Sequence, residues 1–272
     1  MALGLSLTSC QNFYDVESTH YISADENHLV NATDTIYSVT GILNKLQAIA
    51  DRTILLGELR GDLVNVNKYA SSDIRDIANF EINDNNKYNA PSDYYAVINN
   101  CNYFIANVDS AQQNNRGERI FKKEYAAVKS IRAWTYLQLV LNYGKVPFVT
   151  KPILSKEDSE KKYPMYGIND ICDYFLYDDG LADDPELLDS TQNVSYIELP
   201  SYGDINSKAS RLFYIPLRIL LGDLNLWAGN YLRAAEYYYK YISLRNGRNV
   251  PYPIGNYCTE WTNDTWTGWS ST

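Results

Sequence analysis

The stretch from Phe121 to Pro152 constrains the fold of this chain more than any other part of the sequence. In its first part, apolar residues recur at spacings of three to five, which keeps them near one face of an α-helix. These residues are Tyr125, Val128, Ile131, Tyr136, Leu139 and Val140. Gly144 then supplies a residue that readily takes a positive φ just past a helix end. Pro147 disfavours a helical conformation at the residue before it, so residues 145–154 are predicted to be extended.

The same periodicity predicts helices on both sides of this stretch and no long strand. The expected ranges are 33–46, 72–80, 91–108, 166–176, 216–228 and 231–243. Gly229 and Asn230 separate the last two helices, which predicts a helical hairpin with Ala234 and Ala235 at a close contact. Residues 155–163 are predicted to form a charged linker. These patterns together predict an all-α fold of stacked TPR-like helical hairpins with long loops.

The composition fits a globular protein and argues against some classes of partner. With 272 residues, of which 45% are hydrophobic and 21% charged, the chain can bury a substantial core. Its net charge of −9 argues against nucleic-acid binding and against a polybasic membrane anchor, since both need a basic surface. Neutral sugars are compatible with this charge. The 25 Tyr and 5 Trp residues supply rings for stacking on sugars, although we expect most of the tyrosines to pack in the interior.

Residues 131–154, IRAWTYLQLVLNYGKVPFVTKPIL, resemble the signature of the SusD/RagB family, the surface glycan-binding lipoproteins of Bacteroidetes. In that family a long helix with an Arg-Ala-aromatic step ends in a Tyr-Gly-x-Val-Pro turn. Residues 57–62, 94–102 and 220–235 are similar to three further family motifs, in the same order along the chain. The resemblance implies TPR-like stacking more firmly than the spacing does. It also implies that the domain, residues 33–272, lacks the C-terminal portion with which family members normally continue.

The N-terminal residues are predicted to direct the protein to a membrane surface. Residues 1–10 read as the end of a lipoprotein signal, because Leu7-Thr8-Ser9-Cys10 resembles a bacterial lipobox. Cys10 would then carry the lipid, and residues 11–32 would form an irregular leader. The alternative is an ordinary cysteine near the N-terminus. The family resemblance implies a surface-exposed protein that is held on the outer membrane through the lipid anchor alone.

Two groups of residues are candidates for ligand binding. Asn65, Asn67 and Tyr69 lie in a polar loop, where amides match sugar hydroxyls and a ring can stack on a pyranose. A second, aromatic-rich segment contains Trp261, Trp266 and Trp269. The alternative for this segment is a hydrophobic edge that packs on the rest of the family fold. The resemblance implies an oligosaccharide ligand and a TonB-dependent SusC-like transporter as partner.

The sequence offers little for catalysis, for a metal or for a cofactor. It contains no Gly-x-Ser-x-Gly elbow and no glycine-rich phosphate loop. The four cysteines show no CxxC spacing and the chain has two histidines, so no metal site is predicted. Cys101 and Cys172 are predicted to be buried free thiols, without excluding a disulfide. We therefore expect that the protein is not an enzyme, has no catalytic residue and binds no cofactor.

Two pairs of aspartates are the only features that favour an enzyme. Asp178-Asp179 and Asp183-Asp184 are adjacent carboxylates, whereas a glycosidase needs two carboxylates facing each other across a sugar bond. Both pairs are predicted to be solvated turns. A helical glycoside hydrolase is therefore the weakest alternative to a glycan binder, and a TPR-like peptide-binding or protein-binding scaffold is the stronger one.

Three charged residues near these motifs allow both a structural and a functional interpretation. Arg132 lies among apolar neighbours, where it could clamp a ligand or bond a carboxylate inside the protein. The structural role is the favoured one. Arg60 and Asp62 allow the same two roles, again with structure favoured.

Overall fold

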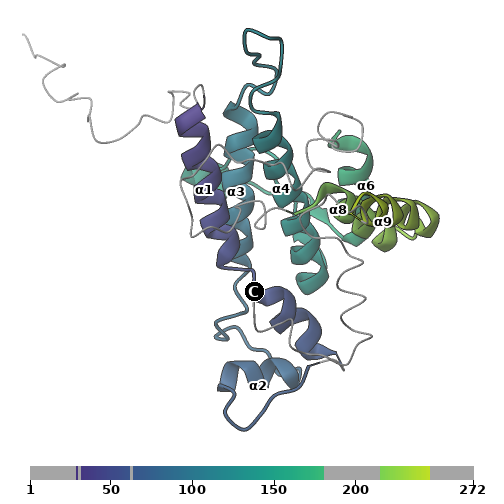
Figure 1. The fold of residues 1–272 in the computed structure, drawn as a ribbon. Coiled ribbons are helices and arrows are strands. Elements are labelled where there is room, and N and C mark those ends of the chain that lie inside the picture. Colours follow the sequence, from purple (N-terminus) through teal and green to yellow (C-terminus); the bar gives the residue numbers. More distant parts are fainter. Residues whose placement is uncertain (1–28, 30–31, 62–63, 181–214, 246–272) are drawn as a thin grey trace, which may run out of the picture.

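The chain folds into an all-α structure in the computed structural model, which describes residues 29, 32–61, 64–180 and 215–245 (Figure 1). Three long helices lie side by side at its centre: α1 (Ala32–Gln47), α3 (Pro91–Asn107) and α4 (Lys122–Tyr143). Their buried apolar side chains form most of one continuous core. Among the described helices, none is both long and apolar enough to cross a membrane.

A second group of helices packs against the other side of α4 (Figure 1). Helix α6 (Ile168–Asp173) runs directly into a π-helical turn, η4 (Tyr174–Asp178). Helices α8 (Leu217–Trp227) and α9 (Tyr231–Arg245) form a hairpin, and α8 reaches both α4 and α6. These bounds agree with the predicted helices to within a few residues. The regular stacking of TPR-like hairpins stays a prediction.

Helix α4 is buried on more sides than its apolar pattern indicated. The predicted stripe is largely buried, together with the polar Lys129, Arg132 and Thr135 that share its side of the helix. Ala126, Ser130 and Leu137 lie on another face and are buried too. The reason is its central position, since α3 covers one side and α6 and α8 cover another. A helix surrounded in this way must satisfy its buried polar groups inside the protein.

The end of α4 matches the prediction from its sequence. Gly144 takes a φ of +76°, and its amide donates to the Val140 carbonyl oxygen at 2.8 Å. The chain then runs extended into β1 (Val146–Pro147), which pairs antiparallel with β2 (Met165–Tyr166). Val146 lies opposite Tyr166 in this short ladder.

The predicted linker at residues 155–163 is partly helical instead. Helix α5 (Lys156–Ser159) forms there because Ser155 caps it, with the Ser155 hydroxyl accepting from the Asp158 amide at 3.1 Å. The charge pattern of this segment did not reveal the cap or the exposed ion pair between Lys161 and Asp158. The sequence therefore predicted a linker without a helix.

The region between α1 and α3 holds a small satellite core. A π-helical turn, η2 (Thr53–Gly57), and a 3₁₀ turn, η3 (Glu58–Arg60), precede the short helix α2 (Ser72–Ala78). Leu56, Leu59 and Ile77 are buried together in this core. The sequence indicated the α2 helix but not the two irregular turns, because single turns carry no periodicity long enough to detect.

The turn between α8 and α9 is fixed by its backbone. The amide of Asn230 donates to the Asn225 carbonyl at 2.8 Å, and the amide of Gly229 donates to the Leu226 carbonyl at 3.1 Å. This pair of bonds is a Schellman motif, in which the residue just past the cap takes a positive φ. Gly229 does so, with a φ of +80°.

The contact between α8 and α9 was predicted correctly at one of two alanines. Ala234 is buried, whereas Ala235 is exposed, so the expected close contact at Ala235 is wrong. The two residues lie about 100° apart around the helix, and the sequence alone did not distinguish which one faces α8. The helices also approach closely at Gly222, where an added Cβ would lie 2.3 Å from the Tyr238 ring.

Replacing Ala234 with Trp should therefore destabilise the protein, and the same change at Ala235 should not. We expect Ala234→Trp to lower the free energy of unfolding by about 1–3 kcal/mol through overpacking. Ala235→Trp serves as the matched control and should stay within about 0.5 kcal/mol of the unmodified protein. Urea unfolding followed by circular dichroism measures both, and equal losses would contradict this helix register.

Candidate functional site

The predicted ligand-binding loop lies on the surface between η3 and α2. Asn65, Asn67 and Tyr69 are all exposed, and 81% of Tyr69 is accessible to solvent. The structure thus brings these three candidates together in one loop. The other candidates, Trp261, Trp266 and Trp269, lie outside the described residues, as does Cys10.

The side-chain carbonyl oxygens of Asn65 and Asn67 order this loop by accepting hydrogen bonds from its backbone. Asn65 Oδ1 accepts from the Val66 amide at 2.8 Å, and Asn67 Oδ1 accepts from the Tyr69 amide at 2.9 Å. Within the described residues, neither Nδ2 group makes a hydrogen bond. The Lys68 ammonium lies 5.0 Å from the centre of the Tyr69 ring. The loop therefore presents an aromatic ring together with two amide donors.

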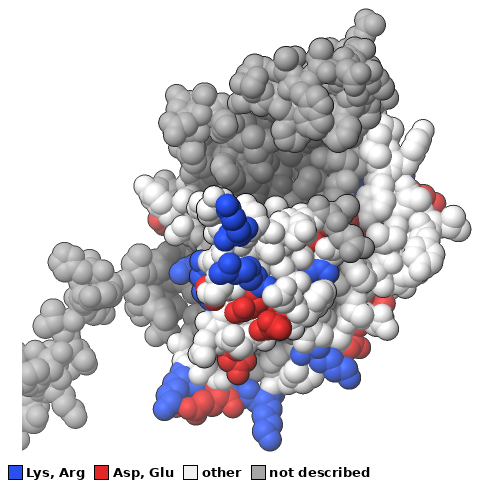
Figure 2. Space-filling view, turned by 90° about the horizontal axis from the view of Figure 1, so that it is seen from below, with Lys and Arg blue, Asp and Glu red and all other residues white. Residues whose placement is uncertain are grey.

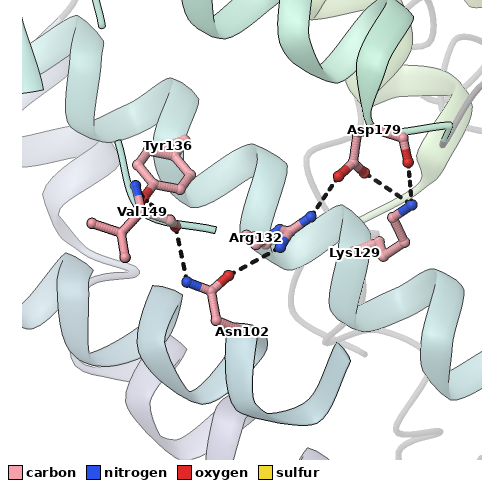
Figure 3. A network of polar contacts seen from close by, with 6 residues as sticks. All are labelled: Asn102, Lys129, Arg132, Tyr136, Val149 and Asp179. Carbon is pink, nitrogen blue, oxygen red and sulfur yellow. Dashed lines mark hydrogen bonds and ion pairs between the residues drawn. The ribbon is translucent and has the colours of Figure 1, made fainter. Parts of the chain in front are cut away.

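Arg132 is the centre of a buried polar network rather than a ligand clamp (Figure 3). Its Nη2 atom lies 2.5 Å from Asp179 Oδ1, and its Nη1 atom donates to Asn102 Oδ1 at 3.0 Å. Lys129 reaches the same aspartate, with Nζ 3.1 Å from Oδ2 and a hydrogen bond to the backbone carbonyl. The structural role predicted for Arg132 is confirmed.

Asp179 contradicts the prediction that Asp178-Asp179 is a solvated turn. Its side chain is buried and balances two cations, while Asp178 beside it is exposed. The sequence could not reveal this pairing, because Arg132 and Asp179 are 47 residues apart. A buried carboxylate that is paired with two cations in this way has a structural role. Asp183-Asp184 lies outside the described residues.

The polar residues of α3 hold the extended segment that follows α4. Asn99 exchanges two hydrogen bonds with the Ile153 backbone, donating at 3.1 Å and accepting at 2.7 Å. Asn102 Nδ2 donates to the Val149 carbonyl at 2.9 Å. From α4, the Tyr136 hydroxyl lies 2.8 Å from both the nitrogen and the oxygen of Val149 (Figure 3). Burial of this hydroxyl raises the pKa of Tyr136.

Two further arginines are also structural. Arg60 Nη2 donates to Asn142 Oδ1 at 2.8 Å, and its Nε bonds the Leu56 carbonyl, so the turn η3 is tied to α4. The favoured role of Arg60 is confirmed, and Asp62 lies outside the described residues. The buried Arg52 forms an ion pair with Asp93, which is partly exposed at the start of α3. Sequence reasoning missed Arg52, which lies in a segment without clear periodicity.

The described cysteines are structural, as predicted. Cys101 and Cys172 are buried free thiols, and burial raises the pKa of each to about 12. Such thiols stay protonated at neutral pH and are poor nucleophiles. Among the described residues, no three His, Cys, Asp or Glu side chains lie close enough to hold a metal ion. Cys258 is not among the described residues.

Sequence reasoning missed a group of exposed rings beside the turn between α8 and α9. Tyr177, Trp227 and Tyr231 have exposed fractions of 62%, 51% and 68%. Asn230 connects them, because its Nδ2 atom lies 3.3 Å from the Tyr177 hydroxyl. The pair Trp227 and Tyr231 around Gly229-Asn230 was a usable signal, whereas Tyr177 lies 53 residues from Asn230 and gave none.

The charged surface shows no dominant sign on the face that Figure 2 presents. Basic and acidic side chains lie next to each other on the described part of this face, and much of its surface carries neither. Several of the exposed charges are paired, such as Arg233 with Glu236. A mixed surface of this kind attracts neither polyanions nor polycations strongly.

The network predicts a large difference between two similar charge deletions. Asp179→Asn leaves Arg132 and Lys129 buried without a carboxylate and should lower the free energy of unfolding by about 3–5 kcal/mol. Glu236→Gln removes the exposed partner of Arg233 and should change it by about 0–1 kcal/mol. Chemical denaturation of both variants at pH 7 provides the measurement. Similar losses would mean that the network does not determine stability.

Comparison of this chain with protein-family models, with curated proteins and with solved structures found no match.

Proposed function

We propose that this protein is a non-enzymatic, surface-exposed lipoprotein of the outer membrane. It binds oligosaccharides and passes them to a TonB-dependent SusC-like transporter. The proposal is supported by the resemblance of residues 57–62, 94–102, 131–154 and 220–235 to the SusD/RagB family. The structural observation that carries it is the exposed Tyr69 ring, which lies in the same exposed loop as the amide donors of Asn65 and Asn67.

Binding of a sugar by such a loop requires no catalysed reaction. A Tyr ring stacks on the apolar face of a pyranose, and amide donors bond its hydroxyl groups. Each contact is weak, so the protein would raise the local concentration of ligand rather than hold it for long. Because a neutral ligand carries no charge, its affinity should depend little on salt.

Anchoring and transfer complete the proposal. Lipidation at Cys10 would hold the protein at the membrane, since acyl chains contribute roughly 0.8 kcal/mol for each buried CH₂ group. In the resembled family, the helical protein forms a lid over its barrel-shaped transporter. The same arrangement is proposed here, with the transporter as the protein partner.

A peptide-binding or protein-binding scaffold is the second candidate function, and one observation favours it. Helix α9 exposes Leu232, Ala235, Tyr239 and Ile242, which recur at spacings of three, four and three. This spacing places them on one apolar face that the described residues leave uncovered. Such a face is typical of a surface that packs against another helix. Both functions could operate in one protein, because a glycan carrier must also contact its transporter.

The glycan proposal predicts that removing one exposed ring weakens binding. Affinity for neutral hexasaccharides of glucose, xylose, mannose or galactose can be measured by calorimetry at low and high salt. Tyr69→Ala should lose roughly 1–3 kcal/mol of binding free energy, by analogy with the stacking of bases on aromatic side chains. Wild-type affinity should be unchanged by salt.

The control is Tyr37→Ala on α1, which removes a ring of similar exposure, 71%, outside the loop. It should bind as the wild type does. Equal losses in both variants would contradict a site at Tyr69. If the wild type binds none of the four saccharides, the proposed glycan function is wrong.

The proposed anchor makes a separate prediction. When the chain is produced behind a complete lipoprotein signal, Cys10→Ala should move the protein from the membrane fraction to the soluble fraction. The reason is that the lipid can be attached only to this thiol. Fractionation followed by a salt and carbonate wash measures the shift, and a variant that stays on the membrane would refute the lipobox.

A further inference from the structure

We propose that Tyr177, Trp227 and Tyr231 form a second binding platform, which takes a neutral sugar ring of an oligosaccharide. The platform lies where η4 meets the turn between α8 and α9. The inference rests on the proposed glycan function, because it names a further surface for the same class of ligand. Trp227 and Tyr231 lie within the motif at residues 220–235, whereas Tyr177 belongs neither to a motif nor to the loop at Tyr69.

The three rings come from separate parts of the chain and are brought to one place. Trp227 is the last residue of α8 and Tyr231 is the first residue of α9, so they flank the turn. Tyr177 belongs to η4, and its hydroxyl lies 3.3 Å from Asn230 Nδ2 in that turn. Each of the three rings keeps half or more of its surface exposed.

The backbone turn that carries Trp227 and Tyr231 is ordered without a ligand. The Schellman motif fixes residues 225–230 by two backbone hydrogen bonds, and Gly229 takes the positive φ that the motif requires. Behind it, the buried Ala234 and the close contact of Gly222 with Tyr238 lock α8 against α9. A preordered surface loses little conformational entropy on binding, which matters most when each contact is weak.

The polar groups between the rings favour a sugar over a purely apolar partner. Within the described residues, Asn230 Oδ1 accepts no hydrogen bond, and the Tyr177 hydroxyl remains able to donate one. An acceptor and a donor beside aromatic faces match the alternating hydroxyl and C–H surfaces of a pyranose. The nearest charged pair on α9, Arg233 and Glu236, neutralises itself at 3.0 Å. Asn230 and the Tyr177 hydroxyl thus supply uncharged hydrogen-bonding groups beside the rings.

The platform is distinct from the loop at Tyr69. Figure 1 places the α8–α9 hairpin and the α2 region, which follows that loop, in separate parts of the molecule. Two separated aromatic surfaces would suit a long polymer better than a single sugar, because contacts at both raise the effective affinity for one chain. We therefore expect the two platforms to contribute separately to the affinity for an oligosaccharide.

Calorimetry on the full chain with the same four neutral hexasaccharides tests this inference. Trp227→Ala should weaken binding by about 5- to 150-fold, the range expected for loss of one stacking ring. Trp227→Phe keeps a ring and should bind within about threefold of the wild type. The double variant Tyr69→Ala, Trp227→Ala should bind more weakly than either single variant, because the platforms are separate.

Controls assign each outcome to one proposal. Tyr37→Ala should bind as the wild type does, and coinciding thermal melts should show that the Trp227 variants are folded. If Trp227→Ala binds like the wild type while Tyr69→Ala is weakened, the second platform is wrong and the proposed function stands. If Trp227→Ala and Trp227→Phe are weakened equally, ring stacking is not the interaction and the inference fails. If no saccharide binds the wild type, the proposed function fails, and the platform fails with it.

Discussion

The ion pair between Arg132 and Asp179 is the interaction on which the arrangement of the described helices depends. Arg132 lies on α4, and because its guanidinium also bonds Asn102, one side chain connects α3, α4 and the residue after η4. Lys129 adds a second cation to the same carboxylate. Buried charges are tolerated only when they are paired, so an arrangement that moved η4 away from α4 would leave charges unpaired. The network thus selects one packing among the many that apolar helices allow.

The buried network also shows what some residues of the family-like motifs do in the structure. The arginine of the Arg-Ala-aromatic step is Arg132. Two of the three asparagines of residues 94–102, Asn99 and Asn102, hold the backbone at Ile153 and Val149. These three residues therefore position the chain after α4, and none of them is an exposed ligand contact. Such motifs carry information about the fold. Ligand contacts would lie on exposed loops and turns, where the sequence is free to vary with the ligand.

The sequence predicted those parts of the fold that depend on neighbours along the chain. The Gly144 turn, the start of α3 at Pro91 and the hairpin around Gly229 all follow from local preferences. Features set by distant contacts were missed or mistaken. Asp179 is buried because Arg132 approaches from 47 residues away, and Tyr177 joins the exposed rings only through Asn230. In the candidate site, the loop at Tyr69 was predictable from its polar composition, whereas the group of rings at Trp227 required the packing of η4 on α8.

The two aromatic surfaces are made rigid in different ways, and this difference bears on how each could bind. The loop at Tyr69 is ordered by short contacts from its own asparagine side chains to the backbone. The turn at Trp227 is ordered by the backbone and by a helical hairpin that packs on the main core. The loop lies on the surface outside any helix, where local opening costs less free energy, and this would let it adapt to ligands of different shape. The turn keeps its backbone in place, and a preorganised backbone loses little flexibility on binding. A carrier could bind one glycan through an adaptable loop and a preordered turn. It would then combine tolerance of ligand shape with a defined orientation toward its partner.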